Sequence, residues 1–151
     1  MFKIRNILLP TDFSNLSLSA ANYAIELAKK YKANIHLLHV LEKTPPVMAI
    51  HSLNPQIESF SAYIEEDAKQ TLEKAIKKVK KGGIKVIGTI KKGLDYQEIV
   101  SYAENNKMDI IVIATHGRTG LLHTLIGSVA EKVIRYSKIP VLVTTPSENE
   151  K

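Results

Sequence analysis

The segment best suited to chemistry spans positions 114–128 and reads ATHGRTGLLHTLIGS. Nine residues separate Gly117 from Gly127, and Ser128 follows the second glycine. Glycine lets the backbone approach a phosphate closely, and the free amides and dipole at a helix start attract an anion. These residues could therefore hold a phosphate. Ser128 with Glu131 also fits an ordinary capping box, so the segment alone leaves both interpretations open.

A carboxylate with a candidate binding role, Asp12, comes shortly after the apolar run at positions 4–9. A carboxylate only accepts hydrogen bonds, so Asp12 could hold a ribose hydroxyl or an exocyclic amine. It could equally cap the helix that follows, a role for which Ser14 is as good a candidate. The residues alone do not separate these roles.

Histidine and cysteine chemistry has little support in the sequence. Cysteine is absent, which excludes disulfides, thiolate catalysis and cysteine-bound metals. His36 and His39 lie three apart on a predicted strand, so their side chains point to opposite faces and cannot share an ion. His116 and His123 fall in one loop that offers no evident third ligand. We therefore expect no metal site built on histidine.

Familiar nucleotide and nucleophile motifs are missing. The chain has no G-x-x-x-x-G-K-[ST], which excludes the usual P-loop, and no G-x-S-x-G elbow. The first predicted strand-to-helix turn contains no glycine, which excludes a dinucleotide fingerprint. Any phosphate site is therefore expected in the second half of the chain.

Five short apolar runs, rich in Ile, Val and Leu, predict the strands. All except the third are near-continuous, which is typical of strands buried on both faces of a parallel sheet. The runs occupy positions 4–9, 35–40, 84–90, 109–115 and 139–144.

Helical periodicity lies between these runs. The first helical pattern follows TDFS and has a stop signal at Asn34, and the second ends at the glycine pair 82–83. A third is predicted to begin near Asp95, with Glu98 as its capping-box partner, and a fourth begins at Ser128. The order βαβαβαβαβ predicts an open α/β sheet with right-handed crossovers.

Ligands of such sheets bind beyond the carboxyl ends of the strands, near the point where the strand order reverses. Three segments are expected to meet there: LLPTDFS after the first strand, HVLEK after the second and IATHGRTG after the fourth. The stretch 41–59 holds three prolines and predicts a long connecting loop of the kind that often forms lids or is disordered. We expect one domain over residues 1–145 and a frayed tail over 146–151.

The composition is that of a globular protein, with neither a membrane span nor a signal peptide evident, so a cytoplasmic location is expected. The net charge of +6 arises largely from eight lysines at positions 74–94, a stretch with no acidic residue. Arginine is scarce and no aromatic residue interleaves these lysines, so a solvated helix face is favoured over a nucleic-acid site.

Taken together, NILLPTDFS, IHLLHV and DIIVIATHGRTGLLHTLIGSVAEKVIRYSKIPVLVT closely resemble the universal stress protein family, in order and over nearly the whole chain. The region 41–81 matches least. The resemblance implies a five-stranded parallel sheet of order 3-2-1-4-5 with helices on both faces. It also implies a dimer that pairs the last strands, which would place Pro140, Val141, Leu142 and Val143 at the contact.

Some members of this family bind ATP through the pattern G-x-x-G, nine residues, then G-[ST]. The first glycine of the pattern is replaced by Ala114 here, which carries no conformational cost if the backbone stays in the β region. A need for positive φ or for ligand contact at that position would instead weaken binding. The resemblance implies that Asp12 and the Val40 backbone hold adenine, that Pro10 and Thr11 lie beside the nucleoside, that Ile113 and Ala114 line the ribose, and that Gly117, Gly127, Ser128 and Val129 meet the phosphates. Arg118 could add charge at the phosphate end or remain a solvated loop residue.

These observations predict a dimeric, nucleotide-binding regulatory protein of the stress response, with ATP or another adenine nucleotide as cofactor and Mg²⁺ as an optional companion. The alternative is a nucleotide-free dimeric interaction module of the same family, which Ala114 favours. Turnover would be slow ATP hydrolysis at most, because no base or arginine–lysine clamp accompanies the glycine loop. A phospho-receiver is disfavoured because the third predicted strand carries no aspartate.

Overall fold

The computed structural model describes residues 3–42, 55–116 and 126–145, with the backbone alone for 55–58. Strands and helices alternate along these residues, as the apolar runs predict. The elements are β1 (Asn6–Pro10), α1 (Asn15–Tyr31), β2 (Asn34–Glu42), α3 (Pro55–Val79), β3 (Val86–Gly93), α4 (Asp95–Asn105), β4 (Ile110–Ala114), α5 (Ser128–Tyr136) and β5 (Val141–Thr144).

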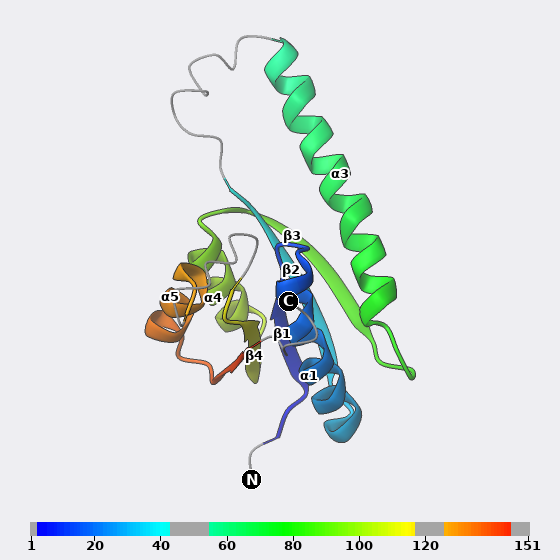
Figure 1. Ribbon diagram of the computed structural model, residues 1–151, viewed down its shortest axis with the longest axis vertical. Coiled ribbons are helices and arrows are strands. Elements are labelled where there is room, and N and C mark those ends of the chain that lie inside the picture. The colour runs from blue at the N-terminus through cyan, green and yellow to red at the C-terminus, as the bar shows by residue number, and fades with distance from the viewer. Residues whose placement is uncertain (1–2, 43–54, 117–125, 146–151) are drawn as a thin grey trace.

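The strands form one parallel sheet in the order β3-β2-β1-β4-β5, which confirms the predicted topology. β1 lies at the centre, between β2 and β4 (Figure 1). The chain builds outward from β1 through β2 and β3, then returns to the other side of β1 with β4. The strand order therefore reverses between β1 and β4, and this is where the carboxyl ends of the strands leave room for a ligand.

Both faces of the sheet are covered, so alternate residues of a strand enter different cores. On β1, Leu9 packs with α1 and α3, whereas Leu8 packs with α4 and α5. Leu37 and Leu38 of β2 divide in the same way. This two-sided burial is the physical reason for near-continuous apolar runs, since neither face can be polar.

One predicted helix stop and two predicted helix caps need correction. Helix α1 ends before Lys32, which adopts a left-handed φ of 55°, so Asn34 is the first residue of β2 instead of a helix stop. Helix α4 is preceded by Leu94 without a side-chain cap. Asp95 is already helical, and its carboxylate accepts from the Tyr96 amide, so the predicted capping box with Glu98 is wrong.

Helix α5 begins at Ser128 as predicted, but its cap differs from the prediction. Its N-cap residue is Gly127, no side chain caps it, and Ser128 is the first helical residue. The cap lies one residue earlier than predicted because the Gly127 amide donates to the Thr115 carbonyl at 2.6 Å, which anchors the turn there. The capping box of Ser128 and Glu131 is therefore wrong, and Glu131 pairs instead with Arg135.

The connection between β2 and α3 is shorter than predicted. β2 continues to Glu42 and α3 begins at Pro55, a residue well suited to the first helical position because it has no amide hydrogen to leave unpaired. Residues 43–54 lie outside the described part of the chain, as does the predicted tail 146–151. Helix α3 projects well beyond the end of the sheet (Figure 1).

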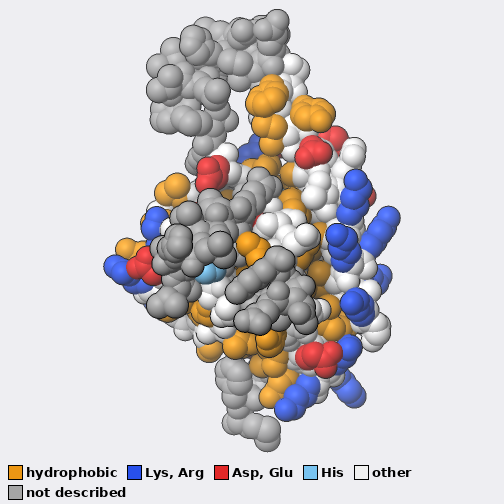
Figure 2. All heavy atoms as spheres, in the orientation of Figure 1, with side chains coloured by type: hydrophobic (Ala, Val, Ile, Leu, Met, Phe, Trp, Pro, Cys, Tyr) orange, Lys and Arg blue, Asp and Glu red, His pale blue; other side chains and the backbone are white. Residues whose placement is uncertain are grey.

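The lysine-rich stretch 74–94 lies on the end of α3 and on β3. All eight of its lysines are exposed, as expected for a solvated face, and Lys side chains gather along the side of the molecule formed by α3 (Figure 2). Among the described helices, none is long and apolar enough to cross a membrane.

Candidate functional site

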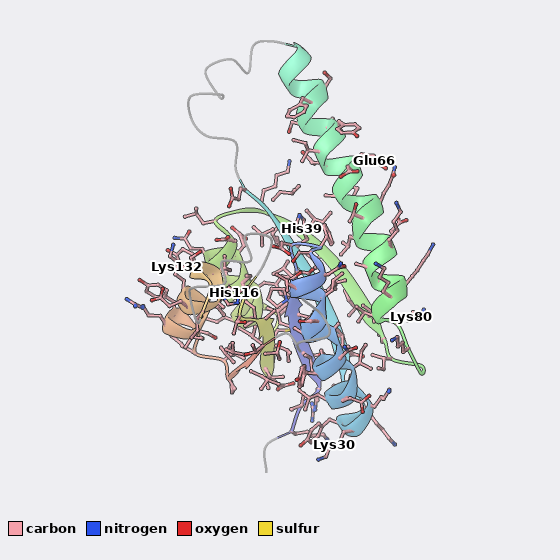
Figure 3. The ribbon with its side chains drawn as sticks, in the orientation of Figure 1. Lys30, His39, Glu66, Lys80, His116 and Lys132 are labelled. Atoms are coloured by element: carbon pink, nitrogen blue, oxygen red, sulfur yellow. The ribbon has the colours of Figure 1, made fainter. Side chains whose placement is uncertain are left out.

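The candidate site lies at the carboxyl ends of β1 and β4. The register pairs Leu8 with Ile111, so the last residues of these strands, Pro10 and Ala114, finish close to one another. The α5 start joins them, because Gly127 bonds to Thr115 directly after β4. The labelled His39 and His116 lie toward this end of the sheet, and Lys30 lies at the opposite end (Figure 3).

The turn after β1 is held by the buried Thr11. Its amide donates to the Leu38 carbonyl at 2.8 Å, which adds one more rung between β1 and β2. Its hydroxyl lies 2.9 Å from the Ser17 hydroxyl and accepts from the Phe13 amide at 2.9 Å. Its carbonyl accepts from Nδ1 of His39 at 2.8 Å. Every polar atom of Thr11 is therefore bonded within the fold.

Asp12 organises the start of α1. Its Oδ1 accepts from both the amide and the hydroxyl of Ser14, at 3.0 and 2.5 Å. Ser14 is the N-cap of α1 and accepts from the Ser17 amide at 3.1 Å. Of the two candidates for the cap, Ser14 therefore holds the position and Asp12 supports it. The Asp12 side chain is half-buried at the carboxyl end of the sheet.

The β1–β2 hydrogen-bond ladder ends at this turn, and Val40 is the first residue of β2 that faces the β1 side without a partner strand. Because Thr11 bonds to Leu38, the backbone groups of Leu38 face β1, and those of Val40, two residues on, face the same side. β1 has ended there. Among the described residues no backbone hydrogen bond joins Val40 to the turn, so its N–H and C=O are directed at the space beyond β1.

Ala114 and Ile113 end β4 with their side chains on opposite faces. Ala114 is buried with the α1 core and Ile113 with the α4 and α5 core. Ala114 pairs with Thr144 in the ladder and is not among the described non-glycine residues with positive φ. Alanine therefore fits this position without backbone strain, and its methyl group is packed in the core on the α1 side.

At the start of α5, glycine is needed at 127 for space. A Cβ on Gly127 would lie 2.7 Å from the Thr115 carbonyl oxygen, although its φ of −70° suits any residue. The first turn of α5 starts with exposed Ser128 and half-buried Val129 and has no side-chain cap. Its amides are therefore open to an anion. Gly117 and Arg118 lie outside the described residues.

The two strand histidines point to opposite faces, as predicted. His39 stacks on Phe13 before α1, whereas Nδ1 of His36 lies 2.9 Å from the Tyr102 hydroxyl of α4. Burial, and secondarily the charge of Lys85, lower the pKa of His36 below its ordinary 6.5. Over the described parts of the chain, no cluster of His, Asp or Glu could hold a metal ion.

Sequence reasoning missed His39 and Phe13 as components of this site. Phe13 has a φ of 66°, a conformation that is unusual for a bulky residue and often marks functional turns. Its ring lies 4.1 Å from that of His39, centre to centre, with 26° between the planes. The available signal was the position of His39, a polar residue in an apolar strand near the crevice.

The sequence of this chain matches the family model of the universal stress protein family over residues 3–145. Universal stress protein MJ0531 of Methanocaldococcus jannaschii is 36% identical over 146 residues, which is 97% of this chain and 85% of that protein.

Solved structures have the same fold. That of MJ0577 from the same organism, described as a structure-based assignment of biochemical function, is 33% identical with a TM-score of 0.83, covering 96% of this chain and 98% of that one. A universal stress protein in complex with cAMP is 23% identical with a TM-score of 0.69, covering 96% and 99%. The family match, the relatives and the shared topology agree that the chain belongs to the universal stress protein family.

Proposed function

We propose that this protein is an adenine-nucleotide-binding regulator, with ATP as its principal ligand. The observation that carries the proposal is the pair of Val40 backbone groups directed at the crevice beside Asp12. Adenine presents a ring-nitrogen acceptor next to an amino donor. One N–H and one C=O from the same strand residue match that edge, and the Asp12 carboxylate offers a further acceptor.

The phosphates would lie toward the start of α5. The uncapped amides of Ser128 and Val129 and the positive end of the helix dipole favour an anion there. Pro10, Thr11 and Ile113 would flank the nucleoside, and Gly117 and Arg118 would complete the phosphate end, with Mg²⁺ as an optional companion. The related protein solved in complex with cAMP supports an adenine-containing ligand.

Ala114 supports retention of binding in spite of the altered glycine pattern. Its backbone lies in the ladder and its methyl group is buried against the α1 core, so the substitution removes no required conformation. The alternative function is a dimeric interaction module of the same family that binds no nucleotide.

We also propose a cytoplasmic homodimer formed by the edge strand β5. β4 bonds through the carbonyls of Pro140 and Thr144, so Val141 and Val143 direct their backbone groups away from β4. Among the described strands none pairs with that edge, and a partner β5 would satisfy it. Leu142 packs into the core of its own protomer. Val143→Pro removes one outward amide, so light scattering should report a monomer, whereas Val143→Ala should stay dimeric.

Nucleotide binding is tested directly on the purified protein. Mass spectrometry of the denatured protein would identify any retained nucleotide, and calorimetric titration with ATP, AMP and cAMP would rank the ligands. Asp12→Ala should weaken binding at least roughly tenfold, because an acceptor in the crevice is lost. Lys80→Ala, at an exposed position on the lysine-rich end of α3, is the matched control and should leave affinity unchanged. The proposal is overturned if neither retained nor titratable nucleotide is found.

A further inference from the structure

We propose that His39 is a positioning residue that keeps the β1–β2 ladder open at Val40 and thereby sets the selectivity for adenine over hypoxanthine. This inference deepens the proposed nucleotide function and rests on it. His39 is buried on β2, next to the residue whose backbone would meet the base.

A β1–β2 ladder that continued past Thr11 would contain two further rungs. After the bond from Thr11 N to Leu38 O, a parallel pair next joins the Val40 amide to the Thr11 carbonyl. It then joins the Phe13 amide to the Val40 carbonyl. Both rungs would consume the Val40 groups that the nucleotide needs.

Side chains have replaced both rungs. Nδ1 of His39 donates to the Thr11 carbonyl at 2.8 Å, which occupies the acceptor that the Val40 amide would otherwise use. The Phe13 amide donates at 2.9 Å to the hydroxyl of Thr11, which removes the donor for the Val40 carbonyl. The Val40 N–H and C=O are thereby left without partners in the turn and face the space beyond β1, although the Thr11 carbonyl and the Phe13 amide are both present nearby.

The His39 ring has a second contact that holds the turn away from β2. Phe13 adopts a φ of 66°, a strained backbone conformation for such a bulky residue. Stacking of its ring on His39, at 4.1 Å, offsets this strain. Asp12 lies between Thr11 and Phe13, and His39 contacts both of these neighbours, so the carboxylate is fixed from both sides.

Two substitutions separate the two contacts. His39→Phe keeps an aromatic ring but cannot donate, so the Thr11 carbonyl becomes available to the Val40 amide and the ladder can close. His39→Asn places a donor at about the position of Nδ1 but has no ring to stack. A residue with only a structural role would instead lose affinity in proportion to lost stability, whichever contact was removed.

The ratio of the affinities for ATP and ITP shows whether the Val40 N–H and C=O are available to the base. Hypoxanthine carries a carbonyl where adenine carries an amine, so it would face the Val40 carbonyl and the Asp12 carboxylate with a third acceptor. We expect the wild-type protein to bind ATP at least roughly tenfold more tightly than ITP. His39→Phe should bring that ratio close to one with no loss of melting temperature. His39→Asn should keep the ratio and melt at a lower temperature.

Two variants act as controls in the same titrations. His36→Phe alters the other strand histidine, which lies on the opposite face, and should leave the ATP-to-ITP ratio unchanged. Gly127→Ala affects the phosphate end and should weaken ATP and ITP equally. A wild-type ratio retained by His39→Phe, or lost by His39→Asn, would overturn the proposal.

A measurement without nucleotide separates this inference from the proposed function. Amide hydrogen exchange should show Val40 exchanging faster than Leu38 in the wild-type protein and becoming protected in His39→Phe. If the wild-type protein binds neither nucleotide, the proposed function and the selectivity fail, while protection of Val40 in the variant still supports the opened ladder. A Val40 amide with equal protection in both proteins would refute the role of His39.

Discussion

Helices α1 and α5 both begin at the carboxyl end of the sheet, yet their first turns are completed in different ways. Ser14 caps α1 by accepting from the Ser17 amide, and Asp12 holds Ser14 in place. The start of α5 has Gly127 at the cap and no side-chain hydrogen bond. The cap of α1 satisfies the Ser17 amide, whereas among the described residues no side chain caps the first turn of α5, which leaves its amides open to an anion.

This difference divides the crevice into two kinds of surface. The side proposed for the base, around Thr11 and His39, is fixed by side-chain hydrogen bonds within the protein. The side proposed for the phosphates depends on backbone amides and on the close contact of Gly127 with Thr115. The base side is therefore suited to selecting a ligand, and the phosphate side to neutralising its charge.

The largest effect is expected from Gly127→Val. A Cβ at this position would lie 2.7 Å from the Thr115 carbonyl, so the α5 start must move away from β4. We expect a loss of about 1–3 kcal/mol in the free energy of unfolding and at least tenfold weaker ATP binding. Urea denaturation and calorimetry measure the two effects. Unchanged affinity in a folded variant would show that the phosphates do not use this turn.

Cap removal tests the comparison of the two helices directly. Ser14→Ala deletes a side-chain cap and should lower the unfolding free energy by about 1 kcal/mol. Ser128→Ala removes a hydroxyl that caps nothing and should change it by less than about 0.5 kcal/mol. Chemical denaturation of both variants at one pH gives the difference. Equal losses would mean that the α5 start is capped in solution.

The sequence predicted the fold better than it predicted the helix caps. Near-continuous apolar runs and their order determined the parallel sheet, because burial on both faces leaves a strong signal. The helix starts at Asp95 and Ser128 were predicted correctly, but each cap was placed one residue late, since a polar residue followed by Glu is also common inside a first turn. Tertiary contact decides the cap, as the bond between Gly127 and Thr115 illustrates.

The candidate site also contains residues that could be predicted from the sequence and residues that could not. Asp12 and Ser128 could be selected as polar residues after apolar runs, before any geometry was known. The role proposed for His39 could not be predicted, because it depends on a strand register that places its ring against the Thr11–Phe13 turn. Non-local register is fixed by packing of the whole sheet, and no local pattern encodes it.

Ala114→Gly restores the glycine pattern and tests whether the methyl group matters to the ligand. The alanine lies in a strand and is buried in the α1 core, so glycine should destabilise the protein by about 0.5–1 kcal/mol. Affinity for ATP should change less than about threefold, because no positive φ is required here. Thermal unfolding and titration of the variant are the measurements. A gain from no binding to clear binding would favour the nucleotide-free module.

The smallest expected effect concerns His36, on the face of the sheet away from the Thr11–Phe13 turn. Burial and then the Lys85 charge lower its pKa in the folded protein below the ordinary 6.5, so folding favours the neutral ring. The unfolded chain therefore binds the proton more readily. The stabilisation is present above pH 6.5 and is lost as the pH falls from there through the lowered folded-state pKa. His36→Asn should flatten this part of the pH–stability curve, measured by denaturation between pH 7.5 and about 5. Because the ring faces α4 and lies away from the crevice, the same variant should leave the ATP-to-ITP ratio at its wild-type value across that range.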